Sequence, residues 1–291
     1  MDNQKLSGVS IIVPLYNREA YIKSTLESIL EQERNFPIEI LVCDDGSTDR
    51  GPEIVRNYPL PVRFLEKPEH CQDQGPAATR NRGIAAAQYA YLAFLDSDDL
   101  FLPGHLLRLY RALEEHPHVH VAVDEFYGFH NDSEKRWLMP YPDGIQLESF
   151  FLNPYMNFGV AMIRQSVLDE VGGPFDVSLR LAEDVDSYLR ILEKHEVMFV
   201  KGSGCALREH GGRSIRNIRE CYHYAELAMK KAIMRYPYPK SLICKRKAVL
   251  QYRFAQADIA DKKYVSALFR LLSAFCLDPG RAIRVVLRGN K

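Results

Sequence analysis

Ala90-Tyr91-Leu92-Ala93-Phe94-Leu95-Asp96-Ser97-Asp98-Asp99 is an apolar run that ends in a group of carboxylates. The apolar part is typical of a buried strand, and the acids then stand where the strand leaves the core. Carboxylates this close repel one another unless a cation or hydrogen bonds compensate. The stretch predicts either a cation site or an acidic turn, because Asp and Ser are also ordinary turn residues.

A second acidic turn, Cys43-Asp44-Asp45-Gly46-Ser47-Thr48-Asp49, follows another apolar run at residues 38–42. Two strands that bring carboxylates to one edge of a sheet are typical of an active site. Ligands of open α/β sheets bind beyond the carboxyl ends of the strands. The repetition therefore favours a functional site over two unrelated turns.

Strand-like and helix-like segments alternate through the first half of the chain. Strands are expected at residues 9–13, 38–42, 62–65, 91–95 and 119–123, and helices from residue 21, from about residue 52, at 76–88 and at 103–115. This alternation predicts an α/β fold with a mostly parallel sheet and helices on both faces.

The second half of the chain gives a weaker pattern. Residues 126–154 are aromatic and contain proline, and we predict a mobile or substrate-facing wall there. Helical spacing returns at residues 181–194, and the chain is expected to be helical beyond residue 214, in three or four segments. The expected domains are a catalytic domain of residues 1–215 and a basic α-helical extension of residues 216–291.

The composition is that of a soluble globular protein, with 46% hydrophobic and 26% charged residues among 291. The formal net charge is zero, but residues 216–291 carry 17 Lys and Arg against 5 Asp and Glu, and residues 1–215 carry 21 against 33. The acidic front suits a cation site. The basic back suits an anionic partner such as a membrane surface or nucleic acid, or is simply a solvated helix face.

Features of targeting point to the cytoplasm. We find no apolar run of about 18–20 residues and no segment of signal-peptide type, and the six cysteines show no paired metal-ligand spacing. The expected location is a reducing, cytoplasmic compartment. Peripheral contact with the inner face of the membrane is a further expectation.

Further motifs stand in order around the two acidic turns. They are Val13-Pro14-Leu15-Tyr16-Asn17, Ala78-Thr79-Arg80-Asn81-Arg82-Gly83, Gly172-Gly173-Pro174-Phe175-Asp176, Glu183-Asp184 and Arg208-Glu209-His210. Over residues 8–215 the series resembles the inverting family-2 glycosyltransferases with the GT-A fold. The resemblance implies a GT-A type sheet sandwiched by helices, followed by a C-terminal helical extension. It also implies that a sugar moves from a nucleoside-diphosphate sugar, with UDP favoured, to a hydroxyl acceptor in the synthesis of a glycan, a cell-surface polysaccharide or a glycolipid.

By this resemblance, one group of residues binds the nucleotide sugar. Asp45 accepts a hydrogen bond from N3–H of a uracil-like base, and Asp96 lies nearer the ribose or the sugar. The other donor-site residues are Pro14, Tyr16 and Asn17 beside the base and ribose, and Arg80 from the helix after Gly75. The alternative for Tyr16 is an ordinary half-buried residue, and Asp44 is expected to hold the shape of its turn.

The resemblance also implies a divalent cation, Mn²⁺ or Mg²⁺. Asp98 is its expected ligand, and His210 is expected near the metal and the diphosphate. A cation suits the reaction because negative charge grows on the departing nucleoside diphosphate. Carboxylate oxygens suit these ions, and phosphate and water complete the shell. Asp99 is either a third member or a cap, and His210 has the alternative of an ordinary loop histidine.

The Glu183-Asp184 pair supplies the second half of the chemistry. A sugar hydroxyl is a poor nucleophile and needs a base within hydrogen-bond reach. The family assigns this role to the aspartate, here Asp184, with Glu183 as its catalytic neighbour. The alternative is structural, because acids are favoured in the first turn of a helix by the backbone dipole.

Two other functions remain open at this point: a nucleotidyltransferase on a similar sheet, and a non-catalytic module that binds nucleotide sugars. The first lacks a Gly-rich phosphate loop after the first strand. The expected partners are the sugar donor and a glycan, glycolipid or lipid-linked acceptor, and do not include nucleic acid. The basic C-terminal helices are expected either to contact the membrane or to pack on the catalytic domain. Their amphipathic face is formed by Arg281, Ile283, Arg284, Val286, Leu287 and Arg288.

Overall fold

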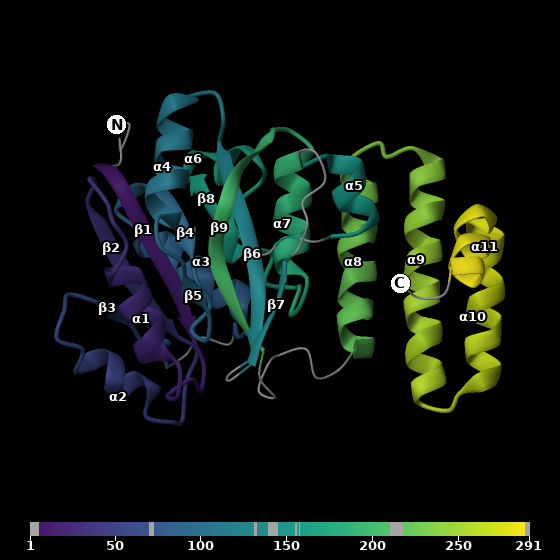
Figure 1. Ribbon diagram of the computed structural model, residues 1–291, viewed down its shortest axis with the longest axis horizontal. Helices are drawn as coiled ribbons and strands as arrows, with labels where there is room; N and C mark the ends of the chain where they lie inside the picture. Colours follow the sequence, from purple (N-terminus) through teal and green to yellow (C-terminus); the bar gives the residue numbers. More distant parts are fainter. Residues whose placement is uncertain are drawn as a thin grey trace. The chain divides into compact units, whose positions relative to one another are not determined.

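The computed structural model in Figure 1 describes residues 6–69, 73–130, 133–138, 145–154, 156, 158–209 and 218–288. The chain forms two compact units. The first contains Met1–Ile145 and Tyr155–Arg213, and the second contains Gln146–Pro154 and Ser214–Lys291. The expected boundary at residue 215 therefore omitted one short segment, because residues 146–154 belong to the second unit.

The described strands of the first unit form one mixed sheet of order β3-β2-β1-β4-β8-β6-β9-β5, with β7 paired to β6. The strands are β1 (Leu6–Leu15), β2 (Ile38–Asp44), β3 (Arg63–Leu65), β4 (Tyr89–Phe94), β5 (Leu100–Phe101), β6 (Val121–His130), β7 (Ser133–Leu138), β8 (Ala161–Arg164) and β9 (Val197–Glu209). The first four neighbours are parallel, as expected, whereas β8 runs antiparallel to both β4 and β6. The expectation of a mostly parallel sheet thus describes only part of it.

Both faces of this sheet are covered. The helices of the first unit are α1 (Ile22–Leu30), α2 (Gly51–Arg56), α3 (Pro76–Ala86), α4 (His105–Glu115), α6 (Ser166–Glu170) and α7 (Glu183–Leu192), with a 3₁₀ turn at Phe158–Val160. Ile11, Ile12 and Val13 in β1 are all fully buried. Since successive side chains of a strand point to opposite faces, β1 is packed on both sides.

The register of β1, β2 and β4 fixes where the acidic turns lie. Leu15 at the end of β1 pairs with Asp44 at the end of β2, and Ile12 pairs with Phe94 at the end of β4. Because these strands are parallel, their carboxyl ends meet at one edge of the sheet. The two acidic turns therefore lie at the same edge, as the sequence predicts.

The segment 126–154 is more regular than expected. Its first part continues β6, its middle forms β7, and its last part forms helix α5 (Leu147–Leu152). The backbone hydrogen bonds of the β6–β7 hairpin and the buried Phe150 and Phe151 of α5 explain the order. The described residues of this segment therefore have regular secondary structure, and the mobile or substrate-facing wall stays a prediction.

The second unit is helical, as predicted. With α5 it contains α8 (Ile218–Arg235), α9 (Lys240–Ala260), α10 (Tyr264–Leu277) and α11 (Pro279–Arg288). Phe151 of α5 stacks on Tyr238 with ring centroids 4.1 Å apart, and Arg246 of α9 donates to the carbonyl of Leu152 at 3.0 Å. None of the helices in the described ranges has the length and apolar character needed to cross a bilayer.

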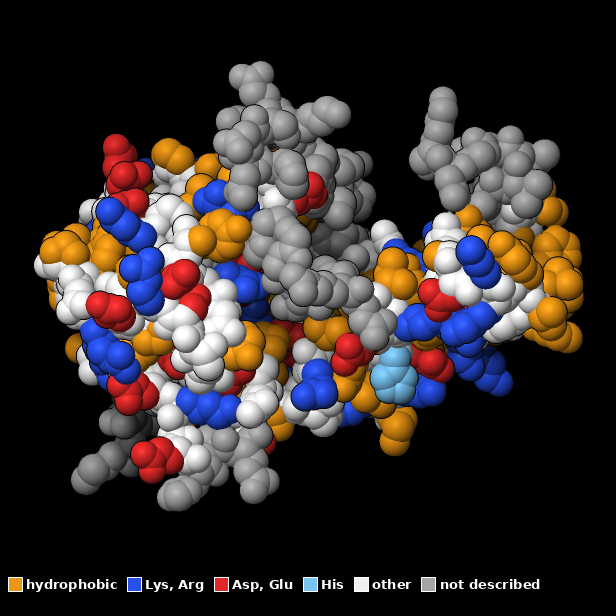
Figure 2. Space-filling model, turned by 90° about the horizontal axis from the view of Figure 1, so that it is seen from below, with side chains coloured by type: hydrophobic (Ala, Val, Ile, Leu, Met, Phe, Trp, Pro, Cys, Tyr) orange, Lys and Arg blue, Asp and Glu red, His pale blue; other side chains and the backbone are white. Residues whose placement is uncertain are grey.

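Asp258 of α9 links three helices of the second unit. Its carboxylate accepts hydrogen bonds from Arg219 of α8 and from Ser266 and Arg270 of α10. The Ser266 hydroxyl and then the arginines hold the pKa of Asp258 at about 2. Figure 2 shows apolar side chains gathered at one edge of the C-terminal helices, at the right of the view, with Lys and Arg side chains beside them.

Candidate active site

The turn after β1 is tied to the turn after β2. Asn17 has a left-handed backbone (φ 52°), which asparagine tolerates better than most residues. Its N–H donates to Ser47 Oγ at 3.0 Å, and its Oδ1 accepts from the N–H of Thr48 at 2.8 Å. Asn17 therefore joins the two turns. These contacts give the predicted donor-site residue a structural role.

Asp44 and Asp45 have different surroundings. The buried Asp44 carboxylate accepts from the N–H groups of Gly46 and Ser47, and so holds the turn, as expected. Asp45 Oδ2 accepts from the N–H of Gly75 at 2.8 Å, and Oδ1 lies 3.6 Å from Lys67 Nζ. Asp45 Oδ1 is buried and has no hydrogen-bond partner within the described part of the chain. A ligand N–H would satisfy this oxygen.

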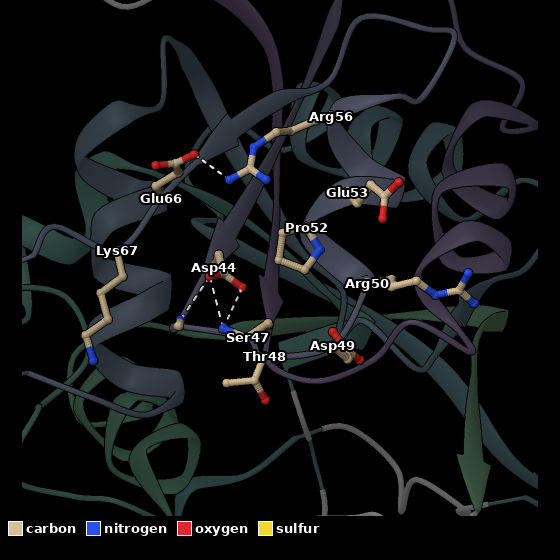
Figure 3. Close-up of a pocket in the computed structure, with 11 residues that line it drawn as sticks. Asp44, Ser47, Thr48, Asp49, Arg50, Pro52, Glu53, Arg56, Glu66 and Lys67 are labelled. Atoms are coloured by element: carbon tan, nitrogen blue, oxygen red, sulfur yellow. Dashed lines mark hydrogen bonds and ion pairs between the residues drawn. The ribbon is translucent and has the colours of Figure 1, made fainter.

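An open pocket of about 390 Å³ lies beside this turn, and Figure 3 shows its lining side chains. Asp44, Ser47 and Lys67 line it together with residues of α2. Lys67 also faces Asp45, so the pocket adjoins the predicted base-binding carboxylate. None of the predicted donor-site residues lines the pocket itself.

Arg80 connects the two acidic motifs. It lies on α3 and is buried, with Nη2 2.7 Å from Asp96 Oδ1 and Nη1 2.7 Å from Glu183 Oε1. Burial opposes its charge, but Asp96 and Glu183 outweigh this and raise its pKa. Arg80 was predicted to reach the nucleotide. In the structure it holds Asp96 and Glu183 together. Arg80 and Glu183 are 103 positions apart in the chain.

The loop before α7 packs beside Arg80. The Arg80 guanidinium lies 5.5 Å from the ring centroid of Phe175. Asn81, the next residue of α3, receives a hydrogen bond from the N–H of Phe175 at 2.9 Å and donates to its carbonyl at 2.8 Å. Arg190 of α7 donates to the carbonyls of Gly173 and Pro174. The Gly172–Asp176 motif is thus a turn fixed by hydrogen bonds from α3 and α7.

Asp184 is the second residue of α7 and is half-buried. Its Oδ1 accepts from the N–H of Val185 at 2.7 Å. Burial raises the pKa of Asp184 to about 7, and the neighbouring Glu183 adds to the rise, whereas Arg80 lowers it. Burial likewise raises the pKa of Glu183. A carboxylate with a pKa near neutrality is suited to accept a proton.

The backbone at the start of α7 is strained. Ala182, the N-cap residue, has φ 62° and ψ 21°, in the left-handed region that non-glycine residues rarely occupy. Strained residues of this kind cluster at functional sites. Here the strain directly precedes Glu183 and Asp184.

Asp98 and Asp99 are held by arginines. Arg18 Nε donates to Asp98 Oδ2 at 2.8 Å, and Arg208 Nε donates to the Asp98 carbonyl at 3.0 Å. Asp99 Oδ1 accepts from the N–H of Arg208 at 2.8 Å, so Asp99 joins the acidic turn to β9. This contact gives Asp99 a structural role. The carboxylate oxygens of Asp98 are suitable ligands for Mg²⁺ or Mn²⁺.

The remaining predicted residues are placed as follows. Pro14 lies in β1 and pairs with Cys43, and Tyr16 directly after β1 is 55% exposed. His210 lies outside the described residues. The contacts of Arg18, Lys67 and Arg208 were not predicted from the sequence. Arg18 directly follows the Pro14–Asn17 motif, which was the available signal for it.

Another group of side chains that could bind a metal ion lies at the opposite edge of the sheet. One ligand atom each of His120, Glu170 and His195 falls within 4.8 Å of the others. His120 directly precedes β6, which runs parallel to β4 because both are antiparallel to β8. Its position is therefore at the amino ends of the strands, away from Asp96. This group is separate from the candidate site.

The sequence model of glycosyl transferase family 2 matches residues 10–172 of the chain, which contain both acidic turns and Arg80. The chain belongs to glycosyl transferase family 2. An uncharacterized glycosyltransferase of Haemophilus influenzae is 31% identical over 193 residues, which cover 64% of this chain and 62% of the relative. The minor teichoic acid biosynthesis protein GgaA of Bacillus subtilis is 35% identical over 126 residues, which cover 40% of this chain.

The match to this family-2 chain spans 27% of the length of GgaA, so most of the GgaA sequence lies outside the matched region. Among solved structures, S. aureus TarS 1–349 in complex with UDP-GlcNAc matches with a TM-score of 0.67 at 20% identity. The match covers 92% of this chain and 81% of that chain. The fold is therefore the α/β GT-A fold with a helical C-terminal region, as the sequence predicts.

Proposed function

We propose that this family-2 glycosyltransferase moves a sugar from a UDP-sugar to a hydroxyl acceptor with inversion. One observation supports it above the others: the buried Arg80 forms ion pairs with both Asp96 and Glu183. Arg80 thereby links Asp96, which is proposed to face the donor, to Glu183 of the pair proposed to face the acceptor. A displacement in one step requires both partners in such proximity.

Asp184 is the proposed general base. Its pKa of about 7 leaves it largely ionised at slightly alkaline pH while it still binds a proton well. The residue as a whole is half-buried, and we propose that an acceptor hydroxyl reaches its carboxylate. Attack from the face opposite the diphosphate inverts the anomeric carbon. Glu183 is proposed to fix Asp184 through the Arg80 ion pair.

Asp98 is the proposed ligand of Mn²⁺ or Mg²⁺. When bound, the ion would neutralise the charge that grows on the departing diphosphate. Arg18 orients Asp98 from one side at 2.8 Å and adds a positive charge next to it. His210 is proposed as a further ligand from the family resemblance alone.

UDP is the proposed nucleotide because Asp45 Oδ1 is a buried acceptor with no hydrogen-bond partner among the described residues. Uracil presents N3–H as a donor, which such an oxygen would accept. S. aureus TarS 1–349 has been solved in complex with UDP-GlcNAc and with UDP. Pro14, Tyr16 and Asn17 are proposed to bound the base and the ribose.

The proposed acceptor class is a cell-surface glycan or a lipid-linked glycan. Support comes from the relatives, among them the minor teichoic acid biosynthesis protein of Bacillus subtilis and glycosyltransferase GlyA of Streptococcus pneumoniae. An acceptor of this class suits an enzyme that works in the cytoplasm at the inner face of the membrane, and we propose that location.

The test is a donor and acceptor screen with the full chain. Release of UDP is measured for several UDP-sugars with Mn²⁺, with Mg²⁺ and with a chelator. We expect turnover that stops on chelation and a product of opposite anomeric configuration by NMR. A product of retained configuration would overturn the mechanism. Binding of UDP-sugars by calorimetry without turnover on any acceptor would instead support the non-catalytic alternative.

A further inference from the structure

Helix α10 turns its large apolar side chains outward. Its small residues Ala267 and Ala274 are buried, and α10 packs along α9. By contrast, Val265 is 73% exposed and Phe269 is 68% exposed. The other exposed large side chains of this helix are Tyr264, Leu268, Leu272 and Phe275. A helix of a soluble protein normally has the reverse arrangement.

The exposed side chains form one continuous stripe. Residues 265, 268, 269, 272 and 275 follow the spacing i, i+3, i+4, i+7 and i+10, which places them on one face of an α-helix. Single exposed apolar residues are common, but a continuous apolar patch of this kind marks an interaction site. The surface formed by Val265, Leu268, Phe269, Leu272 and Phe275 is called the α10 stripe below.

The charge around the α10 stripe restricts what covers it. No Asp or Glu occurs between Lys262 and Leu277. Lys262 and Lys263 are exposed at the start of the helix, where Lys263 Nζ lies 3.5 Å from Asp261. The region 216–291 has 17 basic and 5 acidic residues. A second copy would bring the same positive charge to the contact, which opposes association. An anionic surface would be attracted.

We propose that the α10 stripe docks the protein on an anionic lipid membrane. The helix lies in the plane of the surface, with the stripe among the upper acyl chains and the lysines at the lipid headgroups. Its 14 residues extend for roughly 21 Å, too short for the bilayer core. Docking goes beyond the proposed sugar transfer, because lipid binding needs no turnover and is measured separately.

The experiment is co-sedimentation of the full chain with vesicles. One set contains neutral phosphatidylcholine and the other adds anionic phosphatidylglycerol. We expect binding that requires the anionic lipid and weakens at high salt. The double variant Leu268→Gln, Phe269→Gln is expected to lose binding about tenfold or more, and Lys262→Glu, Lys263→Glu to lose it comparably.

Met234→Gln is the matched control. Met234 lies in α8 of the same unit and is 88% exposed, but it is not part of the α10 stripe. We expect its vesicle binding to remain at the level of the unaltered protein. Thermal melting and UDP-sugar binding are measured for every variant, and both are expected to stay unchanged.

Three results would overturn the docking proposal. The first is the absence of binding to either vesicle, or equal binding to both. The second is a dimer, seen by sedimentation velocity, that the Leu268→Gln, Phe269→Gln variant abolishes, because the stripe then binds a second copy. The third is a clearly lower melting temperature of that variant, because the α10 stripe would then pack against another part of the protein. None of these results bears on sugar transfer.

Discussion

Arg80 of α3 and Glu183 of α7 form a buried ion pair of 2.7 Å between side chains 103 positions apart in the chain. The same guanidinium holds Asp96, so one arginine sets the distance between the acidic turn and the Glu-Asp pair. The electrostatics of the proposed base also depend on it, because the Arg80 charge lowers the pKa of Asp184.

Replacing Arg80 by Lys tests this connection. Lysine keeps the charge but cannot hold two carboxylates in the fork geometry of a guanidinium. We expect kcat/KM to fall by about 10²-fold, because the two carboxylates lose their fixed spacing. The control is Arg111→Lys, at an exposed arginine of α4, where we expect no change. An unchanged kcat/KM in Arg80→Lys would contradict the role of Arg80.

Asp184→Asn is expected to abolish turnover and to stabilise the fold. Its amide oxygen can still accept from the N–H of Val185, so the helix start is retained. Removing a carboxylate with a raised pKa is expected to add about 1 kcal/mol at pH 8, or about 2–4 °C in Tm. Thermal melting and turnover are compared with Asp169→Asn, an exposed acid of α6. Full turnover in Asp184→Asn would eliminate it as the base.

The pH dependence of the unaltered protein gives a second test of Asp184. A base must be ionised, and burial raises the pKa of this carboxyl from its ordinary value to about 7. Protonation therefore removes activity as the pH falls through about 7, and kcat/KM should then drop tenfold per pH unit. Initial rates measured between pH 5 and pH 9, at intervals of about one pH unit, give this pH profile. A flat profile down to pH 5 would exclude the assignment.

Asp45→Asn is expected to weaken UDP binding by about tenfold, since a charged acceptor is lost. An amide can also donate, so discrimination between UDP and CDP should narrow as well, because N3 of cytosine is an acceptor. Calorimetry with both nucleotides gives the ratio. If the UDP to CDP ratio is the same in both proteins, Asp45 does not contact the base.

Gly83→Ala is expected to destabilise the first unit. A Cβ at this position would lie 2.5 Å from Ile12 Cγ2 and 3.0 Å from Cys43 Sγ, where α3 packs on β1 and β2. Overpacking of this kind costs about 1–3 kcal/mol, more than the helix propensity that alanine adds. Urea unfolding measures the change. A gain in stability would show that the contact between helix and sheet yields easily.

The sequence predicts the parallel part of the sheet and both acidic turns, because each depends on a local apolar run followed by acids. It does not predict β8 or β9. The four residues Ala161–Arg164 are too few for a clear pattern, and the alternation in β9 is interrupted between Lys201 and Gly204. The missing β9 also hid the contact of Arg208 with Asp99.

The site was only partly predictable for a similar reason. Motif order indicated that Asp96, Asp98 and Asp184 belong together, but not what joins them. The Arg80 bridge depends on packing between α3 and α7, which no local pattern encodes. The metal, the nucleotide and the roles of the individual carboxylates stay predictions for the experiments above.

The excursion of residues 146–154 has a practical consequence for protein engineering. The chain leaves the first unit at Ile145, contributes α5 to the second, and returns at Tyr155. A gene shortened after codon 213 would strip α5 of its neighbours and uncover Phe150 and Phe151, both almost completely buried in the intact chain. Such a fragment is expected to aggregate into inclusion bodies. A soluble truncated protein also requires residues 146–154 to be replaced by a polar linker.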